Sequence, residues 1–208
     1  MAIADYSDLK QEVIAFTGRD DLSDRFDAFL SLAEAKIYRT NSDRTLRVRE
    51  MEATAALQTV GGTNTLALPA GMLEARSLKI ETSGNKYELE YCSPSAINEY
   101  ESGFPTAFTI KGTDIVFNIV PDGVYDLSLD YYALPDPLIN TDSTNAILTT
   151  YPDIYLFACM AMVYDYTTEP ELGSFNMQKA QASIRGAMKS NERSMRKVPR
   201  AKVSGATP

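Results

Sequence analysis

Apolar residues recur at helical spacing near the start of the chain. They form two runs: Leu9, Val13, Ile14 and Phe16, then Phe26, Phe29, Leu30, Ala33 and Ile37. A period of about 3.6 predicts two helices. We expect Ser7 and Ser23 to cap them, with Gly18 ending the first. Because the joint is short, the helices should form an antiparallel hairpin.

From about Met51 the apolar period changes to two. Leu78 and Ile80 alternate with polar residues, as do Tyr87 and Leu89. Turn-forming stretches separate these runs: GGTN, SGN, KGTD and PDG. Alternation bounded by turns predicts strands, and we expect GGTN and SGN each to close a hairpin. Short connections indicate an antiparallel meander that forms a small sandwich or an open barrel.

Helical spacing returns after a polar, proline-containing loop. The stretch 151–166 is apolar nearly all round, but its uncharged run from Ile154 to Tyr164 is only about half of what a membrane span needs. It predicts a helix enclosed by others. The residues expected to be buried there are Tyr155, Phe157, Ala158, Cys159 and Met162. A last helix should begin near Leu172, with its core face at Phe175, Ala182, Ile184 and Met188.

These patterns predict an α+β fold, a helical bundle with an inserted antiparallel β-meander or sandwich. The expected helical core comprises residues 1–50 and 148–192, around an inserted β domain at 51–133. A connecting loop at 134–147 and a basic flexible tail at 193–208 complete the chain. The N-terminus shows no secretory signal, so we expect a soluble protein made in the cytoplasm, without membrane association.

Charge is distributed unevenly along the chain. The net charge is −8 over 208 residues, yet residues 177–208 carry eight basic residues and one acid. Such an asymmetry is typical of an interaction tail. The candidate residues are Lys189, Arg193, Arg196, Lys197, Arg200 and Lys202.

Composition excludes much enzyme chemistry. The chain has no histidine, which removes histidine bases, histidine-dependent nucleophiles and histidine-ligated metals. No phosphate-binding glycine motif occurs, and Cys92 and Cys159, expected to be buried free thiols, have no metal-ligand spacing. We expect no catalytic residue, no cofactor and no metal. A carboxylate-based hydrolase stays open, and its candidate residues are Asp20, Asp21, Asp24 and Asp27, with Glu50 and Glu52 as similar candidates. The aspartates also suit the start of a helix.

Arginines cluster in a second charged segment, at Arg39, Arg44, Arg47 and Arg49. They either form surface ion pairs or contact another subunit, since arginine forks match carboxylates. In a ring, two different patches of each subunit must meet. Asp20, Asp21 and Asp24 are a plausible complement.

Five ordered blocks resemble a known family. They are FLSLAEAKIYRT...LRVREMEATAAL (29–57), LPAGMLEARSLKI (68–80), LEYCSPSAINEY (89–100), GFPTAFTIKGTDIVFNIVPDGVYDLSLDYYALPDPL (103–138) and TNAILTTYPDIYLFACMAMVYDYTTEPEL (144–172). Together they cover most of the chain. Their order and spacing resemble those of the head-to-tail adaptor proteins of tailed bacteriophages, which lie beneath the portal.

The resemblance implies a structural role without enzymatic activity. It implies a homo-oligomeric ring of usually twelve copies that docks on the portal protein after packaging, binds the next tail or neck protein, and lets double-stranded DNA pass without sequence-specific binding. The expected location is the neck of the virion, after assembly in the host cytoplasm. The basic tail would rise into the portal, or would grip the DNA end. Alternative functions are a tail-associated cell-wall hydrolase using a carboxylate pair and a nucleic-acid-binding protein using the basic tail.

Overall fold

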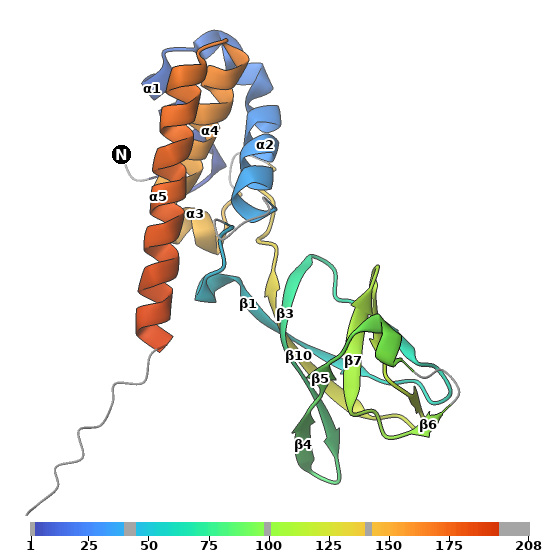
Figure 1. Cartoon of the computed structure of the whole chain (residues 1–208). Coiled ribbons are helices and arrows are strands. Elements are labelled where there is room, and N and C mark those ends of the chain that lie inside the picture. Colours follow the sequence, from blue (N-terminus) through green and yellow to red (C-terminus); the bar gives the residue numbers. More distant parts are fainter. Residues whose placement is uncertain (1–2, 40–44, 98–100, 140–142, 196–208) are drawn as a thin grey trace, which may run out of the picture. The chain divides into compact units, whose positions relative to one another are not determined.

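Two compact units make up the chain. The computed structural model describes residues 3–39, 45–97, 101–139 and 143–195. One unit comprises Met1–Arg49 and Asp136–Pro208 and is helical, and the other, Glu50–Pro135, is a β unit (Figure 1). The chain thus enters the helical unit, leaves it for the β unit and returns. This arrangement confirms the α+β fold.

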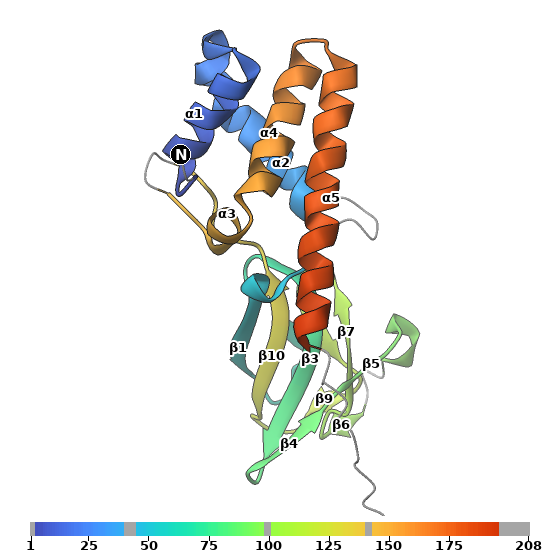
Figure 2. The same cartoon turned by 90° about the vertical axis from the view of Figure 1, so that its left-hand side faces the viewer.

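Helix α4 is the centre of the helical unit. The helices are α1 (Tyr6–Thr17), α2 (Phe26–Tyr38), α3 (Ala146–Thr150), α4 (Pro152–Tyr166) and α5 (Pro170–Met195). Helix α4 packs against α1, α2 and α5 (Figure 2). Because it is flanked on several sides, nearly all of its faces are apolar, and Ile154, Tyr155, Ala158, Cys159 and Ala161 are fully buried. Phe157 is only half-buried, so the expectation that it is enclosed was wrong.

Both predicted caps were wrong. Asp5 caps α1, since its extended backbone lets the carboxylate accept from the Asp8 amide at 2.9 Å. Ser7 therefore lies inside the helix. The 3₁₀ helix η1 (Asp20–Arg25) includes Ser23 and leads directly into α2. The Phe26 amide donates to the Ser23 carbonyl, so η1 backbone replaces a side-chain cap.

The core face of α5 is shifted from the predicted one. Its buried positions are Gly173, Asn176, Ala180, Ile184 and Ala187. Phe175 and Ala182 are exposed. Small residues on this face let α5 approach α4 closely: a Cβ added at Gly173 would meet the Asp165 side chain and lie 3.4 Å from the Ala161 carbonyl oxygen. Helix α5 also continues to Met195, so the expected tail boundary at residue 193 falls inside it.

The β unit is a two-layer sandwich. Its strands are β1 (Glu52–Gln58), β2 (Thr65–Ala67), β3 (Met72–Thr82), β4 (Asn85–Glu88), β5 (Glu90–Tyr91), β6 (Ser102–Gly103), β7 (Ala107–Lys111), β8 (Asp114–Phe117), β9 (Val120–Pro121) and β10 (Asp126–Ala133). One sheet has the order β1-β10-β3-β4 and the other β2-β8-β7-β5, with a β6-β9 pair besides. The buried cluster between them is Leu78, Ile80, Leu89, Phe108, Ile115, Phe117, Leu127 and Leu129.

A simple meander was the wrong topology. The turn SGN does close a hairpin, β3–β4, with Ser83 and Gly84 both at positive φ. The turn GGTN instead connects the two sheets, because β1 pairs with β10 and β2 pairs with β8. Strands β5 and β7 are parallel, as are β6 and β9. Each layer takes strands from distant parts of the unit so that both bury one face in the same core.

The predicted connecting loop is partly built into the core. Leu138 and Asn145 are buried, and α3 starts at Ala146, inside the expected range. The Tyr6 amide donates to the Ser143 carbonyl at 2.9 Å, which ties this segment to the start of α1. Residues 140–142 lie outside the described residues.

Candidate assembly surfaces

The three predicted interface acids lie together on η1, before α2. Asp20, Asp21 and Asp24 are exposed. The Arg19 guanidinium donates two hydrogen bonds of 2.8 Å to the Asp21 carboxylate, and these bonds lower the pKa of Asp21. A general acid for glycoside cleavage needs a raised pKa, so Asp21 has the opposite character. Asp27 accepts a hydrogen bond from the Tyr6 hydroxyl.

The predicted interface arginines follow the other end of α2. Arg39 directly follows the helix and is exposed, and Arg49 is exposed in the 3₁₀ helix η2 (Arg49–Met51). Arg47 instead turns back on its own backbone and donates to the Leu46 carbonyl at 2.7 Å. Arg44 lies outside the described residues. Because α2 has 13 residues, the acidic and basic groups are separated by about 20 Å along it.

The end of α5 forms a basic stripe without a core beneath it. Arg185, Lys189 and Arg193 are exposed and recur every four residues, so they share one side of the helix. Helix α5 has 26 residues against 15 in α4, about 39 Å against 22 Å. After Ala187, none of the described side chains of α5 is buried. Arg196, Lys197, Arg200 and Lys202 lie outside the described residues.

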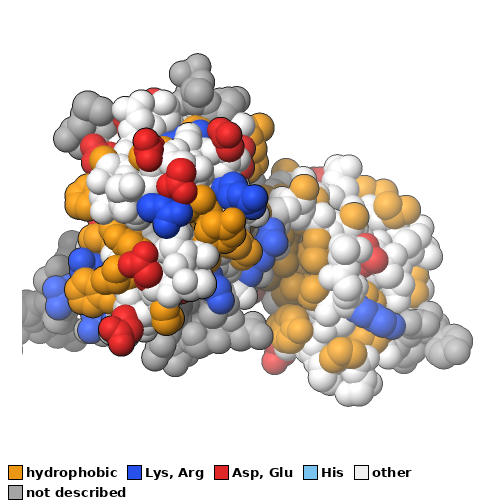
Figure 3. Space-filling model, turned by 90° about the horizontal axis from the view of Figure 1, so that it is seen from above, with side chains coloured by type: hydrophobic (Ala, Val, Ile, Leu, Met, Phe, Trp, Pro, Cys, Tyr) orange, Lys and Arg blue, Asp and Glu red, His pale blue; other side chains and the backbone are white. Residues whose placement is uncertain are grey.

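The opposite end of the helical unit, where α4 joins α5, has mixed chemistry. Acidic and basic side chains are interspersed there with hydrophobic ones (Figure 3). Tyr166 is 50% exposed, its ring lies 5.5 Å from that of Phe29, and the Arg25 guanidinium lies over it at 5.4 Å. This end differs from the basic stripe because neither sign of charge dominates.

A buried polar network, not predicted from the sequence, joins α2, the N-cap of α3 and α4. The Tyr155 hydroxyl lies 2.8 Å from that of Tyr38, accepts from Asn145 Nδ2 at 3.0 Å and lies 3.3 Å from Glu34 Oε1. Burial raises the pKa of both tyrosines. Burial also raises the pKa of Glu34, although the Tyr155 hydrogen bond and the charge of Arg39 oppose it. Asn145 further caps α3 through Oδ1. An asparagine before the apolar run AIL was the available sequence signal for that cap.

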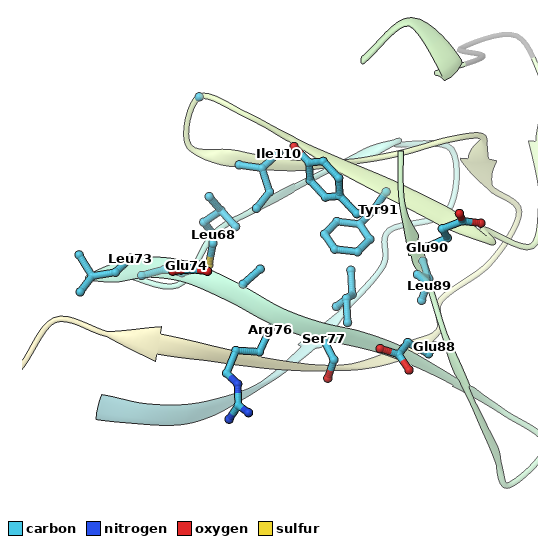
Figure 4. Close-up of a pocket in the computed structure, with 15 residues that line it drawn as sticks. Leu68, Leu73, Glu74, Arg76, Ser77, Glu88, Leu89, Glu90, Tyr91 and Ile110 are labelled. Carbon is cyan, nitrogen blue, oxygen red and sulfur yellow. The ribbon is translucent and has the colours of Figure 1, made fainter. Parts of the chain in front are cut away.

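A groove of about 880 Å³ opens between the sheets of the β unit. Its walls are the first half of β3 and the β7–β8 hairpin, and the crossover from β4 to β5 bounds it (Figure 4). Apolar side chains line it, among them Leu68, Leu73, Tyr91 and Ile110. Glu74, Glu88 and Glu90 also belong to its lining. The groove is thus apolar with an acidic margin.

The described residues also show whether a metal site, a membrane span or a disulfide is present. Among the described residues, no cluster of three or more cysteine, aspartate or glutamate side chains is arranged to hold a metal ion. No helix in the described ranges has the length and hydropathy needed to cross a bilayer. Both cysteines are free thiols, Cys159 buried and Cys92 half-buried, so the expectation of burial was wrong for Cys92.

Comparison with known proteins points to one family. The family model described as SU10 adaptor protein matches residues 4–204, nearly the whole chain. No curated protein matches the chain. The match covers the helical segments on both sides of the insertion and the β unit itself. The chain therefore belongs to the SU10 adaptor protein family.

Proposed function

We propose that the protein is a structural adaptor of a tailed-phage neck. It docks on the portal ring, links the DNA-filled head to the next tail or neck protein and forms part of the DNA channel, in a ring of usually twelve copies. The family match over residues 4–204 carries this proposal. The Arg19 guanidinium lowers the pKa of Asp21, which does not suit the general-acid role that the hydrolase alternative requires.

The proposed portal contact is the basic end of the chain. Lys189 and Arg193 are exposed on the part of α5 after Ala187, where none of the described side chains is fully buried. Arg196, Lys197, Arg200 and Lys202 continue the same charge in the sequence. An exposed helix end with mainly basic side chains suits a partner crevice lined by carboxylates. A basic side chain is favourable near the negative C-terminal end of a helix, which accounts for Arg193. This effect does not account for the basic residues that follow the helix in the sequence.

The proposed subunit contact uses both ends of α2. Asp20 and Asp24 precede the helix, whereas Arg39 and Arg49 follow it. A ring requires two different patches on each subunit. The acidic end of one copy would therefore meet the arginine end of the next. Asp21 contributes less, because Arg19 already neutralises it.

The test is binding of the chain to DNA-free portal. A chain that ends at Met188 retains every buried position of α5 and should stay folded, but should lose portal binding in co-sedimentation. Unchanged affinity of this truncated chain would remove the tail from the portal contact.

A second variant separates portal docking from DNA contact. Replacement of Arg193, Arg196 and Arg200 by lysine keeps the charge but removes the bidentate fork. Portal binding should weaken by roughly tenfold or more if the fork is used. If the tail instead grips DNA, these lysines should suffice, since phosphate contacts depend mostly on charge.

A further inference from the structure

The groove of the β unit is an open corner of the sandwich. Strand β4 pairs with β3 only over Lys79–Thr82, and the pairing ends where the Leu89 amide donates to the Leu78 carbonyl at 2.8 Å. The chain then crosses to the other sheet as β5. Within the described residues, Met72–Ser77 therefore have a partner strand on one side only, which is β10. An edge of this kind accepts another extended segment through backbone hydrogen bonds.

The facing wall of the groove is open in the same way. Strand β5 pairs with β7 only at Ala107 and Phe108. Among the residues that the structure describes, Ile110 and Lys111 of β7 have β8 on one side and no strand on the other. Both walls border the same groove, so an extended segment that lies in it can pair with an open edge.

The apolar lining of the groove is a margin of the β core that water still reaches. Leu68, Met72 and Ile110 pack against the buried core cluster but are only half-buried themselves. Tyr91 is 61% exposed, although its ring meets that of Phe108 edge to face at 5.6 Å. The side chains of Tyr91 and Ile110 extend into the gap between the walls (Figure 4). Apolar residues of an occupant would remove these side chains from water, which is favourable.

One end of the groove, beside the β3–β4 junction, is acidic. Glu88 and Glu90 are exposed there, on either side of Leu89, and neither forms an ion pair with a described residue. The basic side chains of β3 and β4 are paired with other acids: Arg76 with Glu52, Lys79 with Asp130 and Lys86 with Glu81. An occupant with basic side chains at this end is therefore favoured over an acidic one.

We infer that this groove binds an extended segment of a partner protein in which apolar and basic residues alternate. The segment adds a strand to the open edge of Met72–Ser77, which is about 20 Å long and accommodates about six residues. Its apolar residues face Leu68 and Ile110, because alternate side chains of a strand point to the same side. Its basic residues face outward, and those beside the β3–β4 junction reach Glu88 and Glu90.

The partner is a protein other than a second copy of this chain. Residues 46–49 of the chain, LRVR, have the required alternation. However, Leu46 and Val48 are fully buried, so a folded second copy cannot offer them. The contact is additional to the proposed portal and subunit contacts, which use residues of the helical unit, and it does not depend on them.

The first experiment is an NMR titration of the isotope-labelled full chain with a probe peptide. The probe is VKVKVKV, blocked at both ends, and VEVEVEV is its charge-reversed control. The basic peptide should shift the amide signals of Met72–Ser77 and Ile110, whereas the acidic peptide should leave them in place. In the described residues β1 is also an edge strand, but it does not line the groove. Shifts confined to β1, or equal binding of both peptides, would overturn the inference.

The second experiment removes the acidic end of the groove. Glu88→Gln with Glu90→Gln should weaken binding of VKVKVKV by about fivefold, because two exposed ion pairs with the peptide are lost. Glu101→Gln with Glu171→Gln changes the net charge equally at exposed acids outside the groove lining and should leave the affinity unchanged. Equal weakening by both pairs of changes would show a general attraction to an acidic protein and would contradict the inference.

The third experiment identifies the natural occupant in phage particles that carry this chain. Benzoylphenylalanine in place of Tyr91 should crosslink on irradiation to a different protein, at a segment in which apolar and basic residues alternate, as read by mass spectrometry. The same group in place of Val124, which is 67% exposed and does not line the groove, is the matched control. Crosslinks to a second copy of this chain, or a yield equal to that of the control, would overturn the inference. The two peptide experiments use the isolated chain, so their outcome is separate from that of the portal-binding test.

Discussion

The hydroxyl oxygens of Tyr38 and Tyr155 lie 2.8 Å apart in the core of the helical unit, although 117 positions separate the two residues in sequence. Tyr38 ends α2, before the β insertion, and Tyr155 lies in α4, after it. Their rings also meet edge to face, with centroids 6.5 Å apart. The pair therefore joins the two parts of the chain that together form the helical unit.

Removing one hydroxyl of this pair should destabilise the helical unit. Tyr155→Phe removes the partner of the Tyr38 hydroxyl and one of the two acceptors of Asn145 Nδ2, which keeps the Asp136 carbonyl. The expected cost is about 1–3 kcal/mol. In urea unfolding, the double variant with Tyr38→Phe should cost less than the sum of the single changes, because the partners interact. Tyr166→Phe, at a half-exposed position, should stay within about 0.5 kcal/mol of wild type. Additive losses would show that the two hydroxyls are not coupled.

The two glycines of α5 should respond in opposite directions to alanine. Gly186 has no neighbour within 4 Å of an added Cβ, so Gly186→Ala should stabilise by about 0.5–1 kcal/mol through helix propensity. At Gly173 the new Cβ would collide with the Asp165 side chain and press on the Ala161 carbonyl. We expect Gly173→Ala to lower the melting temperature, and Gly186→Ala is its control. Equal gains at both positions would show that α4 and α5 can separate without cost.

Stability should depend on pH through Glu34. Its pKa is raised mainly by burial, so the folded chain binds this proton more tightly than the unfolded chain does. The contribution of Glu34 is therefore most favourable at acid pH and is lost as pH rises through the folded pKa. Glu34→Gln keeps an acceptor for Tyr155 without the charge. Relative to wild type, it should gain more stability at pH 7 than at pH 4 in urea unfolding. A larger relative gain at pH 4 would contradict the assignment.

Charge exchange tests the proposed contact between subunits. Reversal of the acidic end by Asp20→Arg and Asp24→Arg should prevent ring completion on portal, because like charges would then meet. Arg39→Asp with Arg49→Asp should do the same. All four changes together should restore the ring, measured by mass photometry of the portal complex. If rings still form when only the acidic end or only the arginine end is reversed, the subunit contact does not use these residues.

Local pattern predicted much of the fold. The helical period at both ends, the alternation between them and the apolar run at 151–166 depend only on neighbouring residues, and the α+β architecture and the buried helix α4 followed from them. A period shows that one face of an element is apolar, but not what that face packs against. The phase of α5 was therefore missed, since Gly173 and Ala180 are small enough to permit close approach to α4 and outweigh the larger Phe175.

Only the tertiary structure decided which distant segments meet. The alternating pattern predicted that β1 is a strand, but it did not predict which strand pairs with it. In the structure β1 pairs with β10, an arrangement in which both sheets bury one face in a shared core. The groove likewise exists because β4 leaves β3 at Leu78 and crosses to the other sheet. The hydrogen bonds of Tyr155 arise in the same way, from long-range packing that brings α2 and the α3 cap to α4. Such contacts depend on how distant segments are arranged in space, and a short stretch of sequence does not specify that arrangement.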